Sequence, residues 1–362
     1  MNIVIAMDSF KGSMSSAEAG NAAKEGILKI HPDAEVTVLP LADGGEGTID
    51  AITLFLDGTI CQMKVRGPLN DTVDSYYLFV PSQETAYIEM AKASGLTLIS
   101  PDERNPYEAT TYGTGELIKD AIGKGAKKIC VFMGGSATND GGAGMLQALG
   151  CRLLDKNGDD IKSGAIGLKD LDSIDRTGLM GLDVEFIAAT DVTNPLCGTN
   201  GASHVYGPQK GATPEMVRQM NSRLMSFAKT AGHDPDEPGT GAAGGLSFAL
   251  KNFLGAKIVS GADLVTKITG LEEQIKDADI VITGEGKMDS QTLNGKAPFK
   301  VLQLAKRYGK TVYGITGTLS EDTDLLLQAG FTRIIPLMDP SMETDKAVRS
   351  VSMTLKDLFE NI

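Results

Sequence analysis

The chain has 362 residues, of which 41% are hydrophobic and 22% are charged, and its formal net charge at pH 7 is −13. This length is enough for two domains with separate cores, and the composition is that of an ordinary globular protein. The negative charge argues against binding to nucleic acid or to an acidic membrane surface. It does not exclude an anionic small molecule, because lysines and backbone N–H groups can gather locally.

Cysteine usage and the N-terminus both indicate a cytoplasmic protein. The four cysteines form no CxxC pair, so we expect reduced, buried thiols. The chain enters an apolar strand-like run at once, without a basic leader, and no apolar run approaches the roughly 20 residues of a membrane span.

The first sixty residues predict two successive units of strand, polar turn and helix. An apolar run at 2–6 predicts a buried strand, and a capping-box pattern that begins at Ser15 predicts the helix that follows. A second strand is predicted at 35–39 and a second helix at 49–55. This repetition favours a parallel sheet, in which ligands bind at the carboxyl ends of the strands.

The pattern changes between residues 59 and 261. The strands predicted first in this part are short and separated by tight turns, so we expect them to be antiparallel; they are 59–65, 75–80 and 85–90. Further along, helices and strands alternate, with Thr213 and Pro214 as the predicted first residues of a helix. The strand–helix rhythm of a parallel sheet returns from about residue 262, with strands predicted at 279–282, 311–316 and 333–339.

These patterns predict a discontinuous architecture. Residues 1–58 and 262–362 would form one parallel-sheet α/β domain, and residues 59–261 a mixed α/β domain inserted into it. Because ligand sites favour domain interfaces, we expect the active site in the cleft between the two domains.

The segment 131–144 is the most unusual in the chain. A predicted strand at 128–133 breaks into paired glycines and polar side chains, and a helix is expected to follow. Strand, glycine-rich turn and helix start is an arrangement that points backbone N–H groups at an anion. A tight turn without a ligand is the alternative.

Residues 239–244 match the dinucleotide-binding fingerprint GxGxxG, but they lack its context. An Asp-Pro-Asp-Glu-Pro segment precedes them where a hydrophobic strand is required. We therefore expect a loop over 233–245 and no dinucleotide site.

Polar loops of one design, with a carboxylate or a lysine among small residues, follow several predicted strands; they are 8–13, 43–48, 134–144, 191–195 and 284–296. Together they hold what a phosphoryl-transfer enzyme needs, which is N–H groups and lysines for phosphates, carboxylates for Mg²⁺, and a base. A P-loop is absent because Leu304 occupies the position of its first glycine. The chain has three histidines and no GxSxG motif, which disfavours a zinc site and a Ser–His–Asp hydrolase.

Motifs along the whole chain resemble, in order, those of the bacterial type I glycerate kinase family; they are 8–13, 42–48, 134–142, 191–196, 207–212 and 283–296. The resemblance implies a flavodoxin-like (Rossmann-like) domain interrupted by a second α/β domain. It also implies ATP-dependent phosphorylation of D-glycerate, mainly to 2-phosphoglycerate. Phosphorylation at the 3-hydroxyl, a kinase for another small hydroxy acid, and a nucleotide-sensing regulatory protein remain alternatives. We expect a monomer or homodimer that acts on small molecules.

Residue chemistry suggests roles for the carboxylates. Asp191 directly follows a predicted strand and is the first choice for binding Mg²⁺ or for acting as general base. Other candidates for these two roles are Asp43, Glu46, Glu285 and Asp289. Besides Asp191, the predicted metal ligands are Glu285 and Asp289, and Asp289 is also predicted to be catalytic. For each of them, a turn-forming or helix-capping carboxylate is the alternative.

Lysines and polar side chains are expected to bind the two substrates. Lys11, which is also predicted to be catalytic, and Lys287 or Lys296 would contact the ATP phosphates or the glycerate carboxylate. Arg66 would hold the glycerate carboxylate, although a surface arginine is the alternative. The predicted substrate-binding residues are Asp8, Ser9, Lys11, Asp43, Glu46, Arg66 and Asn194. The predicted nucleotide- and phosphate-binding residues are Gly134, Gly135, Ser136, Thr138, Asn139, Asp140, Gly284, Glu285, Gly286, Lys287 and Lys296. His204 is predicted to be structural.

Overall fold

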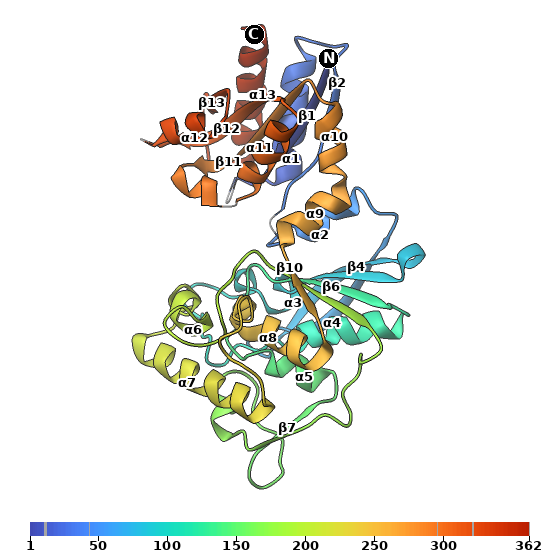
Figure 1. Cartoon of the computed structure of the whole chain (residues 1–362), viewed down its shortest axis with the longest axis vertical. Helices are drawn as coiled ribbons and strands as arrows, with labels where there is room; N and C mark the ends of the chain where they lie inside the picture. The colour runs from blue at the N-terminus through green and yellow to red at the C-terminus, as the bar shows by residue number, and fades with distance from the viewer. Residues whose placement is uncertain (11–12, 43, 295, 321, 362) are drawn as a thin grey trace. The chain divides into compact units, whose positions relative to one another are not determined.

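The computed structural model describes residues 1–10, 13–42, 44–294, 296–320 and 322–361, which form two compact units (Figure 1). The first unit comprises Met1–Asp43, Asp50–Phe55 and Ala262–Ile362, and the second comprises Gly44–Ile49 and Leu56–Gly261. Within the described ranges, no helix is both long and apolar enough to cross a membrane.

The first unit contains a parallel five-stranded sheet. Its strands, in chain order, are β1 (Asn2–Met7), β2 (Glu35–Val38), β11 (Ile280–Met288), β12 (Thr311–Leu319) and β13 (Arg333–Pro336). Their order across the sheet is β13-β12-β11-β1-β2, and every neighbouring pair is parallel. Counted along this unit alone, the order is 2-1-3-4-5, the flavodoxin-like order in which the strand sequence reverses between the first and third strands. The predicted α/β fold with a parallel sheet is confirmed.

Helices cover both faces of this sheet because successive side chains of a strand point to opposite faces. Ile3 and Ile5 belong to the core formed with α1 (Ser16–Leu28) and α13 (Thr344–Glu360). Val4 belongs to the core on the other face, which is closed by α10 (Leu271–Asp277), α11 (Ala297–Arg307) and α12 (Thr323–Ala329). The apolar run at the start of the chain thus sits at the centre of a three-layer unit.

Helix α1 begins with the predicted capping box. The Ser15 hydroxyl accepts a hydrogen bond from the Glu18 N–H at 3.2 Å, and the Glu18 carboxylate accepts one from the Ser15 N–H at 2.8 Å. These bonds satisfy two backbone donors that the first turn of a helix otherwise leaves unpaired. The Ser15 N–H and the Ser15 hydroxyl both donate to the Glu18 carboxylate and lower the pKa of Glu18, the N–H having the larger effect.

The second unit contains a mixed six-stranded sheet in the order β10-β9-β6-β5-β4-β3. The strands are β3 (Thr59–Arg66), β4 (Thr72–Val80), β5 (Thr85–Glu89), β6 (Lys128–Phe132), β9 (Glu185–Ala189) and β10 (Lys257–Val259). The pairs β3–β4 and β4–β5 are antiparallel, as expected, whereas β5 runs parallel to β6. The antiparallel prediction for these three strands is therefore confirmed, and the sheet changes type between β5 and β6.

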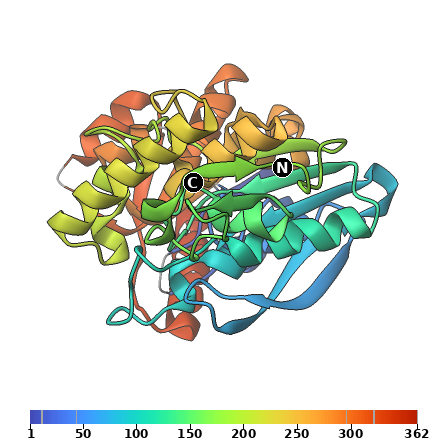
Figure 2. The same ribbon diagram turned by 90° about the horizontal axis from the view of Figure 1, so that it is seen from below.

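One large core joins this sheet to the longer helices of the unit (Figures 1 and 2). These helices are α4 (Tyr112–Gly123), α5 (Ala143–Ala148), α7 (Pro214–Ala231) and α8 (Ala242–Leu254). Helix α7 begins as predicted, with Thr213 as its N-cap and Pro214 in its first turn. The remaining α-helices and strands are α2 (Thr48–Thr53), α3 (Ala91–Ser94), α6 (Ala202–Tyr206), α9 (Gly261–Thr269), β7 (Arg152–Leu154) and β8 (Ser173–Asp175).

Two segments differ from the sequence-based expectation. The strand predicted at 279–282 continues as β11 to Met288, because its pairing with β12 extends to Met288 opposite Leu319. Residues 284–288 are therefore strand rather than loop. The segment Gly44–Ile49, which the sequence places with the terminal domain, packs with the second unit instead, and the Gly134 N–H donates to the Gly44 carbonyl at 3.1 Å.

The contact between α1 and α13 depends on a side chain being absent at Gly26. A Cβ atom there would lie 2.2 Å from the Ser352 carbonyl oxygen, which is backbone and cannot turn aside. Helix propensity alone would make Gly26→Ala stabilising by about 1 kcal/mol. We expect the opposite, a loss of about 2 kcal/mol in the free energy of unfolding, because the helices must separate.

Urea denaturation of the intact protein measures this loss. Asn21→Ala, on the exposed side of the same helix, is the matched control and should change the free energy of unfolding by less than about 0.5 kcal/mol. A Gly26→Ala variant as stable as the wild type would contradict the packing of α1 on α13.

Candidate active site

A cavity of about 510 Å³ opens in the first unit at the carboxyl ends of β1, β11 and β12. This volume lies in the range of small-molecule sites. Met7 pairs with Gly284, so the chain leaves β1 beside the last residues of β11. That is the reversal point of the strand order, where flavodoxin-like sheets bind ligands. The predicted site residues that line the cavity are Asp8, Ser9, Glu285, Gly286, Lys287 and Lys296.

Each of the two lysines in this cavity contacts a carboxylate. Lys296 Nζ lies 2.9 Å from Glu285 Oε2, and Lys287 Nζ lies 3.1 Å from Asp289 Oδ2. The carboxylate side chains are largely buried, whereas the Lys287 side chain is 61% exposed. Lys296 is also the residue before α11, whose first backbone N–H groups carry partial positive charge. The cavity therefore places positive groups where a phosphate could replace the carboxylates as their partner.

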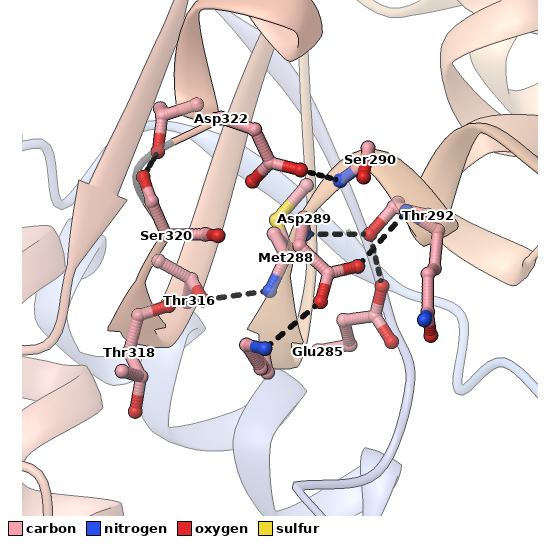
Figure 3. A network of polar contacts seen from close by, with 12 residues as sticks. Glu285, Met288, Asp289, Ser290, Thr292, Thr316, Thr318, Ser320 and Asp322 are labelled. Atoms are coloured by element: carbon pink, nitrogen blue, oxygen red, sulfur yellow. Dashed lines mark hydrogen bonds and ion pairs between the residues drawn. The ribbon is translucent and has the colours of Figure 1, made fainter.

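The Thr292 hydroxyl joins the Glu285 carboxylate to the backbone of Asp289 (Figure 3). Thr292 Oγ1 donates to Glu285 Oε1 at 2.8 Å and accepts from the Asp289 N–H at 3.1 Å. The Gln291 N–H donates to Asp289 Oδ1 at 3.0 Å. The hydrogen bond from Lys287 is the largest of the effects that lower the pKa of Asp289, and the hydrogen bond from the Gln291 N–H lowers it further. Asp289 is therefore ionised at neutral pH, as a metal ligand must be.

Asp322 and Thr316 extend this network, and sequence reasoning missed both. The Ser290 N–H donates to Asp322 Oδ2 at 2.8 Å, and hydrogen bonds from Ser290 and Ser320 lower the pKa of Asp322 to about 2. Thr316 Oγ1 accepts from the Met288 N–H at 3.0 Å and donates to the Thr318 carbonyl at 2.8 Å, which closes the end of β11 against β12 (Figure 3). Both residues act across strands, so no local motif marks them.

In the second unit, the glycines after β6 serve a close contact between two chain segments. A Cβ on Gly134 would lie 2.3 Å from Gly45 Cα, and one on Gly135 would lie 2.9 Å from Glu46 Oε1. Glu46 itself is exposed. The predicted substrate loop and the predicted phosphate loop are thus packed on each other.

Asp140 and Asn139, predicted to bind nucleotide or phosphate, point into the second unit. Asp140 is fully buried and accepts hydrogen bonds from the Gly142 and Gly144 N–H groups and from the N–H and hydroxyl of Thr111. Burial is the main effect on the Asp140 pKa and raises it, against these hydrogen bonds. Asn139 is also fully buried and donates to Ser203 Oγ at 2.8 Å. This geometry favours a structural role for Asp140.

Asp191, Asn194 and Arg66 also lie in the second unit. Asp191 lies two residues beyond the end of β9, is exposed, and accepts a hydrogen bond from Ser260 Oγ at 2.5 Å. Both ends of the Asn194 amide are engaged, since it accepts from the Tyr206 hydroxyl and donates to the Asn200 carbonyl. The Arg66 guanidinium lies 3.8 Å from the centre of the Tyr112 ring. Asp191 is thus exposed but hydrogen-bonded to Ser260, and the Asn194 amide is engaged at both ends.

Two buried charged residues near these loops were not predicted as site residues. Glu89, at the end of β5, accepts from the Gly47 N–H at 3.1 Å and the Ile49 N–H at 3.2 Å, and so anchors the segment Gly44–Ile49. Lys210, which is 2% exposed, lies behind the Gly134 loop, and burial lowers its pKa to about 7. In the sequence, the only sign of a special role for Glu89 is that a charged residue ends an apolar strand. For Lys210, the sign is its place in the motif 207–212.

Lys11 and Asp43 lie outside the described residues. Among the residues that are described, no group of three or more His, Cys, Asp or Glu side chains could hold a metal ion. Mg²⁺ commonly takes one or two carboxylates together with substrate phosphates, so Glu285 and Asp289 fit such a site. Asp191, the third predicted metal ligand, belongs to the other unit.

A sheet of flavodoxin-like order with paired lysines and carboxylates at its reversal point defines an α/β protein built to bind a small anionic ligand. Comparison with known proteins is more specific. The profile of the glycerate kinase family matches residues 3–362. The chain belongs to this family, as its motifs predicted, and it is a kinase.

Individual members of the family are similar to this chain over nearly their whole lengths. The chain is 45% identical to glycerate 2-kinase of Escherichia coli, over 96% of this chain and 93% of that protein. It is 43% identical to a glycerate kinase of Halalkalibacterium halodurans, over 99% and 97% respectively. A crystal structure of a candidate glycerate kinase 2 from Salmonella typhimurium LT2 superimposes with a TM-score of 0.86 at 44% identity, covering 99% of this chain and 97% of that one.

Thr292→Val tests the polar network of the cavity. Valine has nearly the shape of threonine but would leave a Glu285 oxygen and the Asp289 N–H without their partner. We expect a loss of 1–3 kcal/mol in the free energy of unfolding, measured by urea denaturation, because unpaired buried polar groups are costly. Thr292→Ser keeps the hydroxyl and is the matched control. Equal stability of the valine and serine variants would contradict the bridging role of this hydroxyl.

Proposed function

We propose that this protein transfers the γ-phosphoryl group of ATP to the 2-hydroxyl of D-glycerate, giving 2-phosphoglycerate and ADP. The observation that carries the proposal is the cavity at the β1–β11 reversal point, where Lys287 and Lys296 face the carboxylates of Asp289 and Glu285. The names of the relatives, glycerate kinase and glycerate 2-kinase, support the substrate and the position of phosphorylation.

The lining of the cavity supports ATP as its ligand. Its apolar side chains, among them Phe10, Leu337 and Met342, suit the flat face of a purine base. Lys287 and Lys296 suit the phosphates, and the N-terminus of α11 adds further positive potential. We place the nucleotide in the first unit for this reason.

Glu285 and Asp289 would hold Mg²⁺ once the lysines turn to the phosphates. A bound Mg²⁺ neutralises charge on the phosphates during transfer. The low pKa of Asp289 keeps this carboxylate ready for such a ligand over the neutral range.

We assign Asp191 as the general base. As the glycerate hydroxyl oxygen forms its bond to the γ-phosphorus, the bond from that phosphorus to the oxygen of ADP breaks, and the hydroxyl proton passes to the Asp191 carboxylate. The exposed position of Asp191 at the carboxyl end of β9 supports this role. Arg66 is proposed to pair with the glycerate carboxylate. That the two units share one active site remains a prediction, as do the roles of Lys11 and Asp43.

We also propose a cytoplasmic location, supported by four cysteines that are free thiols in the structure. Monomer or homodimer remains the prediction for the oligomeric state.

One experiment tests the reaction and its position together. The purified protein is incubated with D-glycerate and Mg-ATP, and the product is identified by ³¹P and ¹³C NMR. We expect the phosphorus resonance to be split into a doublet by the single proton on carbon 2 of glycerate. A triplet, from the two protons on carbon 3, would move the reaction to the other hydroxyl. Turnover only with another hydroxy acid would change the substrate, and ATP binding without any turnover would favour a regulatory protein.

Asp191→Asn tests the base. Because general base catalysis typically contributes a factor of 10² to 10⁴, we expect kcat to fall at least about a hundredfold while the protein remains folded. Asp183→Asn is the matched control, since it neutralises an exposed carboxylate just before the other end of β9. Turnover of Asp191→Asn close to that of the control, in a coupled assay of ADP release, would remove Asp191 from the mechanism.

A further inference from the structure

Lys210 is a buried cation directly behind the glycine-rich loop after β6. It ends the short helix Pro208–Lys210, and its Nζ donates to Ser136 Oγ at 2.8 Å and to the Thr138 carbonyl at 2.7 Å. The residue is 2% exposed. The side chain therefore ties together both sides of Ala137 in the loop.

The surroundings of Lys210 are unusual for a lysine. Among the described residues, no carboxylate oxygen lies within ion-pairing distance of Lys210 Nζ. The charge of Asp140 acts from farther away and raises the Lys210 pKa, against the effect of burial. Neighbouring segments carry further titratable or cationic residues, among them His204 and Tyr206 on α6 and Arg104, which donates to the Gln209 carbonyl. Burial of an ammonium group without an ion pair is costly, so a protein retains one where its hydrogen bonds serve a purpose.

The hydrogen bond to Ser136 fixes the direction of its hydroxyl proton. Because Ser136 Oγ accepts from Lys210, the Ser136 O–H must donate elsewhere, and no group among the described residues accepts from it. A lysine that donates to a hydroxyl also makes that hydroxyl a stronger donor. The Ser136 backbone is held too, since it forms a β-bridge with Gly95.

A left-handed turn supports the same loop from a second side. Ala243, Gly244 and Gly245 all have positive φ at the start of α8, and the Gly244 carbonyl accepts from the Gly141 N–H at 2.9 Å. A Cβ on Gly244 would lie 2.0 Å from the Thr138 carbonyl oxygen. The segment 239–244, which matched the dinucleotide fingerprint, thus packs against the Gly134 loop. The loop is held rigidly, which suits a binding site more than a simple connection.

We propose that Lys210 is a positioning residue for phosphoryl transfer, which holds the Ser136 hydroxyl as a hydrogen-bond donor to an anionic oxygen of the bound substrates. The inference rests on the proposed function, because it needs an anion at the Gly134 loop. It adds to that function a residue that contacts no substrate and acts through Ser136.

Ser136→Ala, Lys210→Met and the double variant test this chain of action. Loss of a hydrogen bond to a charged group corresponds to a factor of about 10 to 100, so we expect kcat/KM of Ser136→Ala to fall by that factor. If Lys210 acts through Ser136, the double variant should be no slower than the slower single variant. Lys229→Met, at an exposed position of α7 in the same unit, is the control and should have wild-type kinetics.

The dependence of kcat/KM on pH separates positioning from mere support of the fold. Burial lowers the pKa of Lys210 to about 7, so Lys210 loses its charge as the pH rises through this region. The kcat/KM of the wild type should then fall as the pH rises above about 7. The kcat/KM of Ser136→Ala should not show this fall, because the hydroxyl through which Lys210 acts is already absent.

Wild-type kcat/KM in Ser136→Ala would overturn the inference, whether or not Lys210→Met folds. Multiplicative losses in the double variant would overturn it as well, since the two residues would then act separately. If the wild type phosphorylates no hydroxy acid at all, the proposed function fails first, so the two failures are distinguishable.

Discussion

The pairing of β1 with β11 is the constraint on which the rest of the first unit depends. Ile3 pairs with Ile280, so the first strand of the chain is completed by residues that follow the whole inserted unit. This long-range contact must overcome the entropy of closing a very long loop, which only a buried, fully hydrogen-bonded strand pair repays. The same pairing sets Asp8 beside Glu285 and places the reversal of strand order at the cavity. In the first unit, the fold and the cavity therefore depend on the same contact.

In the second unit, buried polar groups fix the positions of the loops. Glu89 holds the segment Gly44–Ile49, Asp140 holds the start of α5 against Thr111, and Lys210 holds the loop between them. Each takes a charged group out of water, which is unfavourable unless its hydrogen bonds are made. Loops fixed in this way keep one conformation, and a phosphoryl-transfer enzyme depends on such positioning because it does little covalent chemistry of its own.

Much of both units could be predicted from local patterns. The Ser15 capping box, the start of α7 at Pro214 and the apolar strands are short-range features, and the structure confirms them. The end of β11 could not be predicted, since glycines and charges at 284–288 suggest a loop until β12 supplies its hydrogen bonds. The parallel edge of β5 and the attachment of Gly44–Ile49 also depend on partners distant in the chain.

The sequence by itself determined the α/β class, the family and the polar segments from which the site is built, because strand periodicity and motif spacing are written locally along the chain. Only the tertiary structure decided what each polar residue does. In the sequence, Asp140, Asn139 and Lys210 resemble Glu285, Lys287 and Lys296, because all six are polar residues in glycine-rich segments. In the structure, the first three are buried among hydrogen-bond partners, whereas the last three line a cavity. Burial and hydrogen-bond partners come from segments far apart in the chain, so they exist only once the chain has folded.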